Sequence, residues 1–354
     1  MPTSALADIE LVHPEPPAKG ELKEVAPGLF WACLPLPFRL NHVNVWALHE
    51  HDGWSVIDCG CGTDEIREIW AHLLGHGLAG RPVRRLIATH GHVDHVGLAG
   101  WLTEKCDAEF HSTLTEWQSP QLFRADMANP PTERLARYFQ QQGCPDGLAT
   151  GLDGQRHGFR KLLGAMPPSF IRFRDGDTLQ IGGRSWRALT NGGHAAEHAS
   201  FYCAADKLLI AGDHILSKIS PVIGVWESQP EADPLGEYFR SLPRFESLPE
   251  PILVLPSHGL PFRRLHRRVA QLRAHHELRL GEVLGALQQP QTAYRLSAAL
   301  FPRHYDGSQA RLALAETLAH VNYLLHKGQI VRQSHAGREP HTYALAVSEP
   351  VAAE

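Results

Sequence analysis

The chain has 354 residues, 43% of them hydrophobic and 20% charged, and its 31 glycines and 26 prolines are spread along its length. This composition excludes collagen-like, coiled-coil and wholly disordered proteins, the length suggests about two domains, and a net charge of -4 argues against a protein built mainly to hold a polyanion. The unusual number is 23 histidines, because histidine is the commonest metal ligand in proteins.

Cysteine usage and the N-terminal segment bear on the compartment. Six cysteines are few for a chain that is long enough to bury a core without disulfides. Residues 1–17 lack a basic segment followed by an apolar one, so a secretory signal is not expected. Nothing in the sequence approaches the roughly 18 consecutive apolar residues of a membrane span. We therefore expect a reduced, cytoplasmic protein that does not enter the membrane.

The first part of the chain predicts an alternation of strands and helix. Residues 1–24, rich in proline and glutamate, predict a loose N-terminal arm. Thr63 is expected to cap a helix with one apolar face, which ends near Gly77. Strands are predicted at 44–48, 54–58 and 86–89. Such a β-α-β unit indicates an α/β sheet whose functional groups gather at the carboxyl edge of its strands.

The middle of the chain predicts a helical insert and then more strands. Residues 112–173 are rich in apolar and aromatic side chains, and we expect them to form a mainly helical lid over the site. A hairpin turned by Gly182 and Gly183 is predicted next. The strands expected in this region are 178–181, 184–189, 207–211 and 252–255.

The periodicity changes after Pro261. The pattern predicts a long helix to about residue 287, a short helix capped by Thr292, a third helix at 308–327, and a hairpin at 329–333 and 342–346. Three helices followed by a two-stranded wing is the order of a winged-helix module. A domain boundary is therefore expected near residue 262, and residues 263–354 carry 12 Lys and Arg against 7 Asp and Glu.

Potential metal ligands gather directly after one predicted strand. Four of them lie within six residues: His90, His92, Asp94 and His95. One buried histidine is usually a core residue, but four such groups packed without a cation would cost several kcal/mol. Three more candidates lie next to predicted strand ends and beside glycines, which allow a close backbone approach: His194, Asp213 and His258.

The H-x-H-x-D-H motif at 90–95, followed at similar intervals by these three residues, resembles the metallo-β-lactamase superfamily over residues 25–262. Asp58 matches the first motif of that family. The resemblance implies an α/β fold, namely a four-layer αβ/βα sandwich, with a two-metal site at one edge. Residues 263–354 resemble the winged helix that is appended to a subset of these hydrolases.

The resemblance also implies a role for each site residue. The implied ligands are His90, His92 and His194 for one metal, Asp94, His95 and His258 for the other, and Asp213 as the bridge. Asp58 would support the ligand loop from behind, and His198 and His214 are expected beside the site without binding metal. Zinc suits such imidazole-rich sites best, with iron or manganese as alternatives.

Within this superfamily the donor types favour a glyoxalase II-like hydrolase. Position 213 holds Asp rather than the Cys of several true β-lactamases, and the second histidine of the motif replaces the acid of the flavodiiron branch. His95 and His258 argue for a second metal, unlike the single-iron sulfur dioxygenases. Only 44 residues separate Asp213 from His258, too few for the inserted domain of the mRNA-processing nucleases.

We expect a dinuclear hydrolase in which a metal-bridging hydroxide attacks an activated acyl substrate, a thioester or lactone, while Asp94 accepts a proton. The alternative is a metal-dependent endoribonuclease that holds RNA with its winged helix. Overall acidity and the apolar insert favour a small acyl substrate, so nucleic acid is not the expected partner. A vestigial site is disfavoured because no ligand position is lost, and the oligomeric state stays open.

Two local features of the sequence concern the surroundings of the predicted ligands. Glu197 occupies a position at which related sequences commonly have Gly, so the sequence does not define the shape of the pocket beside His194. Cys59 and Cys61 lie in the loop after Asp58. Two thiols without a second pair rarely form a structural zinc site, so we expect small buried thiols.

Overall fold

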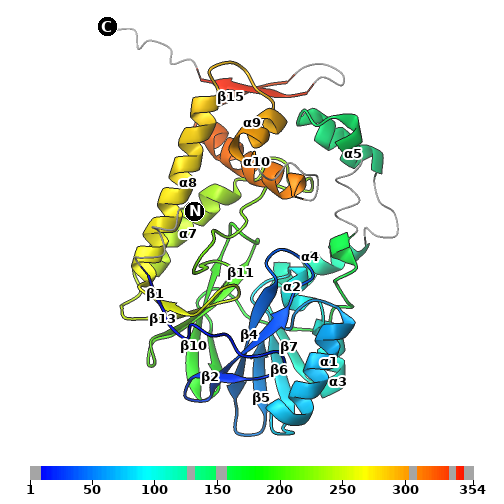
Figure 1. Cartoon of the computed structure of the whole chain (residues 1–354), viewed down its shortest axis with the longest axis vertical. Coiled ribbons are helices and arrows are strands. Elements are labelled where there is room, and N and C mark those ends of the chain that lie inside the picture. The colour runs from blue at the N-terminus through cyan, green and yellow to red at the C-terminus, as the bar shows by residue number, and fades with distance from the viewer. Residues whose placement is uncertain (1–8, 126–131, 149–157, 303–308, 335–339, 347–354) are drawn as a thin grey trace. The chain divides into compact units, whose positions relative to one another are not determined.

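The computed structural model describes residues 9–125, 132–148, 158–302, 309–334 and 340–346 (Figure 1). The chain divides into two compact units, whose segments alternate along the sequence. Unit 1 takes Met1–Asn129, His157–Pro221 and Ser241–Gln271, and unit 2 takes Pro130–Arg156, Val222–Arg240 and Leu272–Glu354. The arm at 1–24 and the boundary near residue 262 stay predictions.

Unit 1 contains two seven-stranded sheets. In the first, β2 to β5 pair in antiparallel fashion and β5 to β8 pair in parallel. Its strands, in spatial order, are β2 (Lys23–Ala26), β3 (Leu29–Pro35), β4 (His42–His49), β5 (Trp54–Ile57), β6 (Val83–Ile87), β7 (Glu109–Ser112) and β8 (Ile171–Arg172). The parallel pairing of β5 with β6 brings the segments that follow these strands to one edge of the sheet.

The second sheet contributes the opposite side of that edge. Its order is β1 (Glu10–Leu11), β14 (Phe262–Arg263), β13 (Leu253–Pro256), β12 (Leu208–Gly212), β11 (His198–Cys203), β10 (Arg184–Asn191) and β9 (Thr178–Ile181). Only β12 and β13 pair in parallel in this sheet as described. The hairpin predicted around Gly182 and Gly183 is confirmed as the β9–β10 pair.

Helices flank the two sheets, which face each other across a shared core. The core between the sheets includes Trp46, Ile87, Trp186 and Phe201. A second buried cluster packs the first sheet against α1 (Asp64–His72) and α3 (Ala99–Cys106) (Figure 1). The Thr63 side chain accepts a hydrogen bond from Ile66 N, so the predicted cap of α1 is confirmed. Two short segments complete this side: η2 (Leu73–Gly77) and α2 (Val93–Val96).

The second sheet is covered by parts of α7 (Pro234–Glu246) and α8 (Leu265–Ala286), both of which run from one unit into the other. Within unit 1, Arg244 on α7 donates to Thr190 O at 2.8 Å, and Arg268 on α8 donates to Leu216 O at 2.6 Å. The four-layer αβ/βα sandwich predicted from the sequence is confirmed.

The segment 112–173 differs in part from the expected helical insert. It contains α4 (Leu114–Ala125) in unit 1 and α5 (Thr132–Gln141) in unit 2, and it ends in strand β8. Strand β8 has only two residues, too few to show an alternating pattern in the sequence. Met127 and residues 149–157 lie outside the described residues.

Unit 2 contains the helices and the hairpin predicted for the C-terminal region. They are α9 (Ala293–Leu300), α10 (Ala310–His326), β15 (Ile330–Gln333) and β16 (Thr342–Leu345). Thr292 accepts a hydrogen bond from Arg295 N and caps α9, as predicted. The 222–240 segment joins this unit, because Asn322 Nδ2 donates to Pro230 O at 2.9 Å and to Ala232 O at 2.8 Å. Within the described parts of the chain, no helix is both long and apolar enough to cross a membrane.

Candidate metal centre

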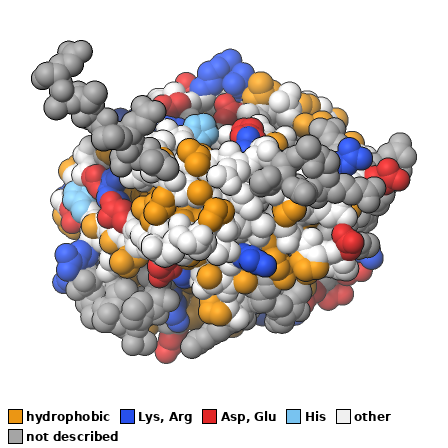
Figure 2. Space-filling model, turned by 90° about the horizontal axis from the view of Figure 1, so that it is seen from above, with side chains coloured by type: hydrophobic (Ala, Val, Ile, Leu, Met, Phe, Trp, Pro, Cys, Tyr) orange, Lys and Arg blue, Asp and Glu red, His pale blue; other side chains and the backbone are white. Residues whose placement is uncertain are grey.

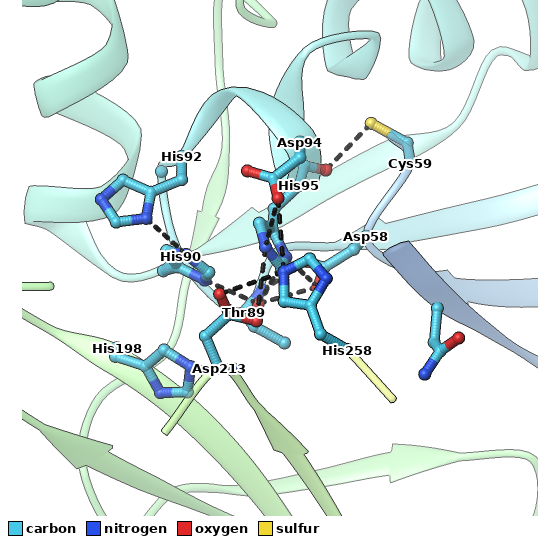
Figure 3. A network of polar contacts seen from close by, with 12 residues as sticks. Asp58, Cys59, Thr89, His90, His92, Asp94, His95, His198, Asp213 and His258 are labelled. Carbon is cyan, nitrogen blue, oxygen red and sulfur yellow. Dashed lines mark hydrogen bonds and ion pairs between the residues drawn. The ribbon is translucent and has the colours of Figure 1, made fainter. Parts of the chain in front are cut away.

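The seven predicted ligands come together at the edge of the two sheets in unit 1. All of them except His194 are labelled in Figure 3. From the first sheet, the loop after β6 and the short helix α2 carry His90, His92, Asp94 and His95. From the second sheet, the segments after β10, β12 and β13 carry His194, Asp213 and His258. The parallel pairs β5–β6 and β12–β13 therefore place residues from distant parts of the sequence at one edge.

These side chains form three overlapping groups of potential ligands, each with donor atoms within 4.8 Å of one another. The groups are His90 with His92 and His194, His90 with His95 and Asp213, and Asp94 with His95 and His258. Asp213 lies between the two outer groups, because its Oδ2 is 3.4 Å from His194 Nε2 and 3.3 Å from His258 Nε2. This is the arrangement that a bridging carboxylate requires.

The contacts inside the cluster fit a bound cation. His90 Nε2 is 2.9 Å from His92 Nδ1 and 3.2 Å from His194 Nε2, so three imidazoles converge on one point. Among the described residues, three buried site atoms have no hydrogen-bond partner: His95 Nε2, His258 Nε2 and Asp213 Oδ1. Buried polar atoms are rarely left in this way, because doing so costs free energy. Imidazole nitrogens and carboxylate oxygens together suit divalent transition metals.

Backbone and carboxylate acceptors orient two of the histidines. His95 donates from Nδ1 to Asp58 Oδ2 at 2.8 Å, while Thr89 donates to both oxygens of Asp58 from its backbone N and Oγ, each at 2.8 Å. His258 donates from Nδ1 to the carbonyl of His42 at 2.7 Å. In both rings the remaining Nε2 faces the cluster, as expected for ligands held by outer hydrogen bonds. Asp58 thus lies where its predicted supporting role requires.

His198 and His214 lie beside the cluster but belong to none of the candidate ligand groups found in the described residues. His198 Nε2 accepts a hydrogen bond from Asp213 N at 3.0 Å. Burial, with His214 nearby, holds the pKa of His198 well below its usual value, which keeps this acceptor nitrogen unprotonated. Gly212 allows this contact, since it has a φ of +56° and a Cβ there would lie 2.4 Å from His198 Nε2.

The pKa values within the cluster divide its histidines into neutral and protonated rings. Burial, followed by the neighbouring His194, lowers the pKa of His92 to about 3. Burial alone would raise the pKa of Asp94, but His95 and His258 outweigh it and lower that pKa to about 2. The His92 lone pair and the Asp94 charge are therefore available at neutral pH. Burial would lower the pKa of His258, but Asp213 and Asp94 outweigh it and raise that pKa to about 10, and Asp94 and Asp213 likewise hold the pKa of His95 well above its usual value. These two rings must therefore release a proton when they bind a metal.

Sequence reasoning missed Asn44, which supports the His258 loop. Its side chain is fully buried in β4, donates to Pro256 O and Gly259 O at 2.8 Å each, and accepts from Trp31 Nε1 at 2.8 Å. These bonds tie the first sheet to the loop of the second. An amide between two valines in a predicted strand is the one signal that the sequence offers.

Two further predictions concern residues near the site. Cys59 and Cys61 are buried free thiols, and Cys59 Sγ donates to His95 O at 3.2 Å, so the expectation of buried thiols is confirmed. Trp117 stacks on Phe170 with ring centroids 4.6 Å apart and packs against the core of unit 1. Whether the insert acts as a lid stays a prediction.

Comparisons with known proteins agree with this fold. Residues 39–258 match the family model described as "Metallo-beta-lactamase superfamily", and residues 280–340 match "Metallo-beta-lactamase-like, C-terminal domain". A beta-lactamase domain protein from Burkholderia ambifaria is 38% identical, with 96% of this chain and 98% of that chain covered and a TM-score of 0.87. A metallo-beta-lactamase family protein from Thermus thermophilus, TTHA1429, is 32% identical, with 91% and 100% covered and a TM-score of 0.78. "Probable metallo-hydrolase YqjP" from Bacillus subtilis is 26% identical over 305 residues, which cover 82% of this chain and 90% of YqjP.

The chain belongs to the metallo-beta-lactamase superfamily. Proteins of this fold bind divalent metals, and the chain is a metal-binding hydrolase of that family with a C-terminal domain of the metallo-beta-lactamase-like type.

Proposed function

We propose that the chain is a glyoxalase II-like hydrolase with two metals, which cleaves an activated acyl compound, a thioester or a lactone. The observation that carries this proposal is the position of Asp213, whose carboxylate contacts one imidazole of each outer ligand group. Two divalent ions bound there would supply a water nucleophile of lowered pKa and positive charge beside the developing oxyanion.

Each residue of the centre would have its own task. His90, His92 and His194 would hold one ion, Asp94, His95 and His258 would hold the other, and Asp213 would contact both. Asp94 would have a second task, because it is the carboxylate that lies in one outer ligand group rather than between the two: it would accept a proton from the attacking water. Asp58 and His198 hold His95 and the Asp213 backbone in place. We propose zinc for this imidazole-rich set, with iron or manganese as alternatives.

We propose that the C-terminal helices and hairpin are a winged helix with a structural role, and that nucleic acid is not the partner. One arginine of the Arg-rich segment after residue 262 supports this view. Arg268 is 1% exposed and donates to Leu216 O and to Ile219 O, so its guanidinium is engaged inside unit 1. On the face seen in Figure 2, the Lys and Arg side chains of the described residues are dispersed among acidic and hydrophobic ones. Six free cysteines fit the cytoplasmic location that we also propose.

Hydrolysis assays on the zinc-loaded full chain test this function. The substrate panel contains acyl-CoA and acyl-glutathione thioesters, lactones and RNA, each with and without prior removal of metal by a chelator. We expect metal-dependent release of the thiol or hydroxy acid and no RNA cleavage. Metal-dependent RNA cleavage without acyl hydrolysis would replace this proposal with the endoribonuclease alternative.

A further inference from the structure

One buried carboxylate joins the two histidine-bearing loops of the centre. Glu116, in the first turn of α4, is 3% exposed. Its Oε2 accepts a hydrogen bond from Gly91 N at 2.7 Å, and its Oε1 accepts one from Glu197 N at 2.8 Å. Gly91 lies between His90 and His92, and Glu197 lies three residues after His194. A single rigid group thus holds the backbone on both sides of one ligand group.

Glu197 in turn accepts hydrogen bonds from the start of the helix that carries Glu116 and from the residue before that helix. The Glu197 side chain accepts from Thr115 N at 2.8 Å through Oε2, and its carbonyl accepts from Thr113 Oγ1 at 3.2 Å. An orphan donor at the start of α4 is satisfied in this way. The residue that stands in place of a common glycine therefore anchors α4 to the loop that carries His194.

The space around Gly91 shows how closely α4 is seated on the ligand loop. A Cβ at Gly91 would lie 2.8 Å from Glu116 O and 2.9 Å from Ser119 Oγ. No side chain separates the helix from the backbone between His90 and His92. The Glu116 carboxylate therefore acts on this loop directly rather than through intervening side chains.

We propose that Glu116 is a positioning residue that sets the spacing between the His90–His92 loop and the His194 loop, and so the metal affinity of that ligand group. This inference rests on the proposed metal centre. The second group, Asp94 with His95 and His258, is held by Asp58 and by the His42 carbonyl instead. Glu116 should therefore influence one of the two ions much more than the other.

The experiment compares three variants of the full chain in competition titrations with a chromophoric chelator, which give a Kd for each metal equivalent. Glu116→Gln keeps the side-chain volume but replaces one carboxylate oxygen with an NH2 group. That group cannot accept a hydrogen bond from the backbone N–H that it faces, so one of the two hydrogen bonds is lost. We expect the Kd of one equivalent to rise about ten- to hundredfold, the usual effect of losing an outer hydrogen-bond partner, and the other to change little.

Two control variants separate positioning from loss of stability. Glu197→Gln keeps the backbone N–H that donates to Glu116, and its amide oxygen can still accept from Thr115 N. It should therefore reduce both the metal affinity and the melting temperature of the metal-free protein far less than Glu116→Gln does. Glu65→Gln changes an exposed glutamate in the first turn of α1 and should leave both quantities unchanged. If Glu116→Gln does not fold, Glu116→Asp carries the same test, because the shorter side chain cannot reach both N–H groups.

The outcomes distinguish this inference from the proposed function. A parent protein that binds no metal would refute the proposed centre itself. A parent that binds two ions, with the Glu116 variant matching it at both, would refute only the positioning role. Equal weakening of both equivalents would also refute it, since it would indicate a general loss of structure.

Discussion

His95 and Asp58 form a buried pair in which His95 Nδ1 donates to Asp58 Oδ2 at 2.8 Å, with the side chains 0% and 1% exposed. The bond fixes a proton on Nδ1 and directs Nε2, the nitrogen that would bind metal, toward Asp94 and Asp213, each 3.6 Å away. The orientation of one candidate ligand is therefore decided by a residue 37 positions earlier in the chain, at the end of β5.

Asp58→Asn is expected to weaken binding of the metal that His95 holds. The amide can still accept from Thr89 N, but its NH2 group would face His95 Nδ1. The ring would then place its proton on Nε2, where the ligand lone pair is needed. We expect a loss of about ten- to hundredfold in affinity, measured by chelator competition. An unchanged affinity would mean that the tautomer of His95 is fixed by other contacts.

The full chain should hold two metal ions. Protein purified without chelator is expected to contain close to two equivalents by elemental analysis. His72 and His76 form an exposed stacked pair with ring centroids 4.8 Å apart, so His76→Gln serves as the control for adventitious binding. A folded chain that contains no metal and takes up none on addition would contradict the prediction.

Asp94→Asn should abolish turnover while leaving the fold intact. The substitution keeps the volume but removes the charge that the proposal uses to bind metal and to accept a proton. We expect kcat to fall at least about a hundredfold, measured on whichever acyl substrate the parent hydrolyses. Asp64→Asn, at an exposed carboxylate of α1, is the matched control and should keep the parent rate. Near-parent turnover of the Asp94 variant would remove this residue from the mechanism.

Stability should depend on pH through Glu316, a carboxyl of α10 in unit 2. Burial raises its pKa to about 7 despite the nearby Arg279. As pH rises from about 4.5 to 7, the unfolded chain releases this proton before the folded one does, so the folded state loses stability over that window. We expect Glu316→Gln to gain stability relative to the parent between pH 5 and 7.5, measured by urea unfolding of metal-free protein. A difference that stays constant with pH would show that Glu316 titrates normally.

The ligands could be predicted from the sequence because their signals are local. Four of them share one short motif, and the others follow apolar strands that end in small residues. Glu116 could not be predicted, because its importance comes from backbone groups 25 and 81 residues away, in both ligand loops. No pattern within a helix reports such long-range hydrogen bonds.

Charge and helical patterns were less informative than the ligand motif. Arg268 belongs to the arginine-rich segment after residue 262, and the sequence does not reveal that its guanidinium is buried against backbone carbonyls. The helical pattern at 112–173 was real for α4 and α5, but it carries no information about which unit each helix joins. In both cases, partners far away in sequence decide where a side chain or a helix packs.

Residues 222–240 belong to unit 2, and this limits how the genes of two related chains can recombine. This segment lies in sequence between Asp213 and His258, yet Val225 N donates to Ala315 O, and Asn322 of α10 binds the carbonyls of Pro230 and Ala232. A single crossover near residue 272 would set a foreign α10 against the native 222–232 stretch. The two segments must therefore be inherited together, although more than 70 residues separate them in the gene product.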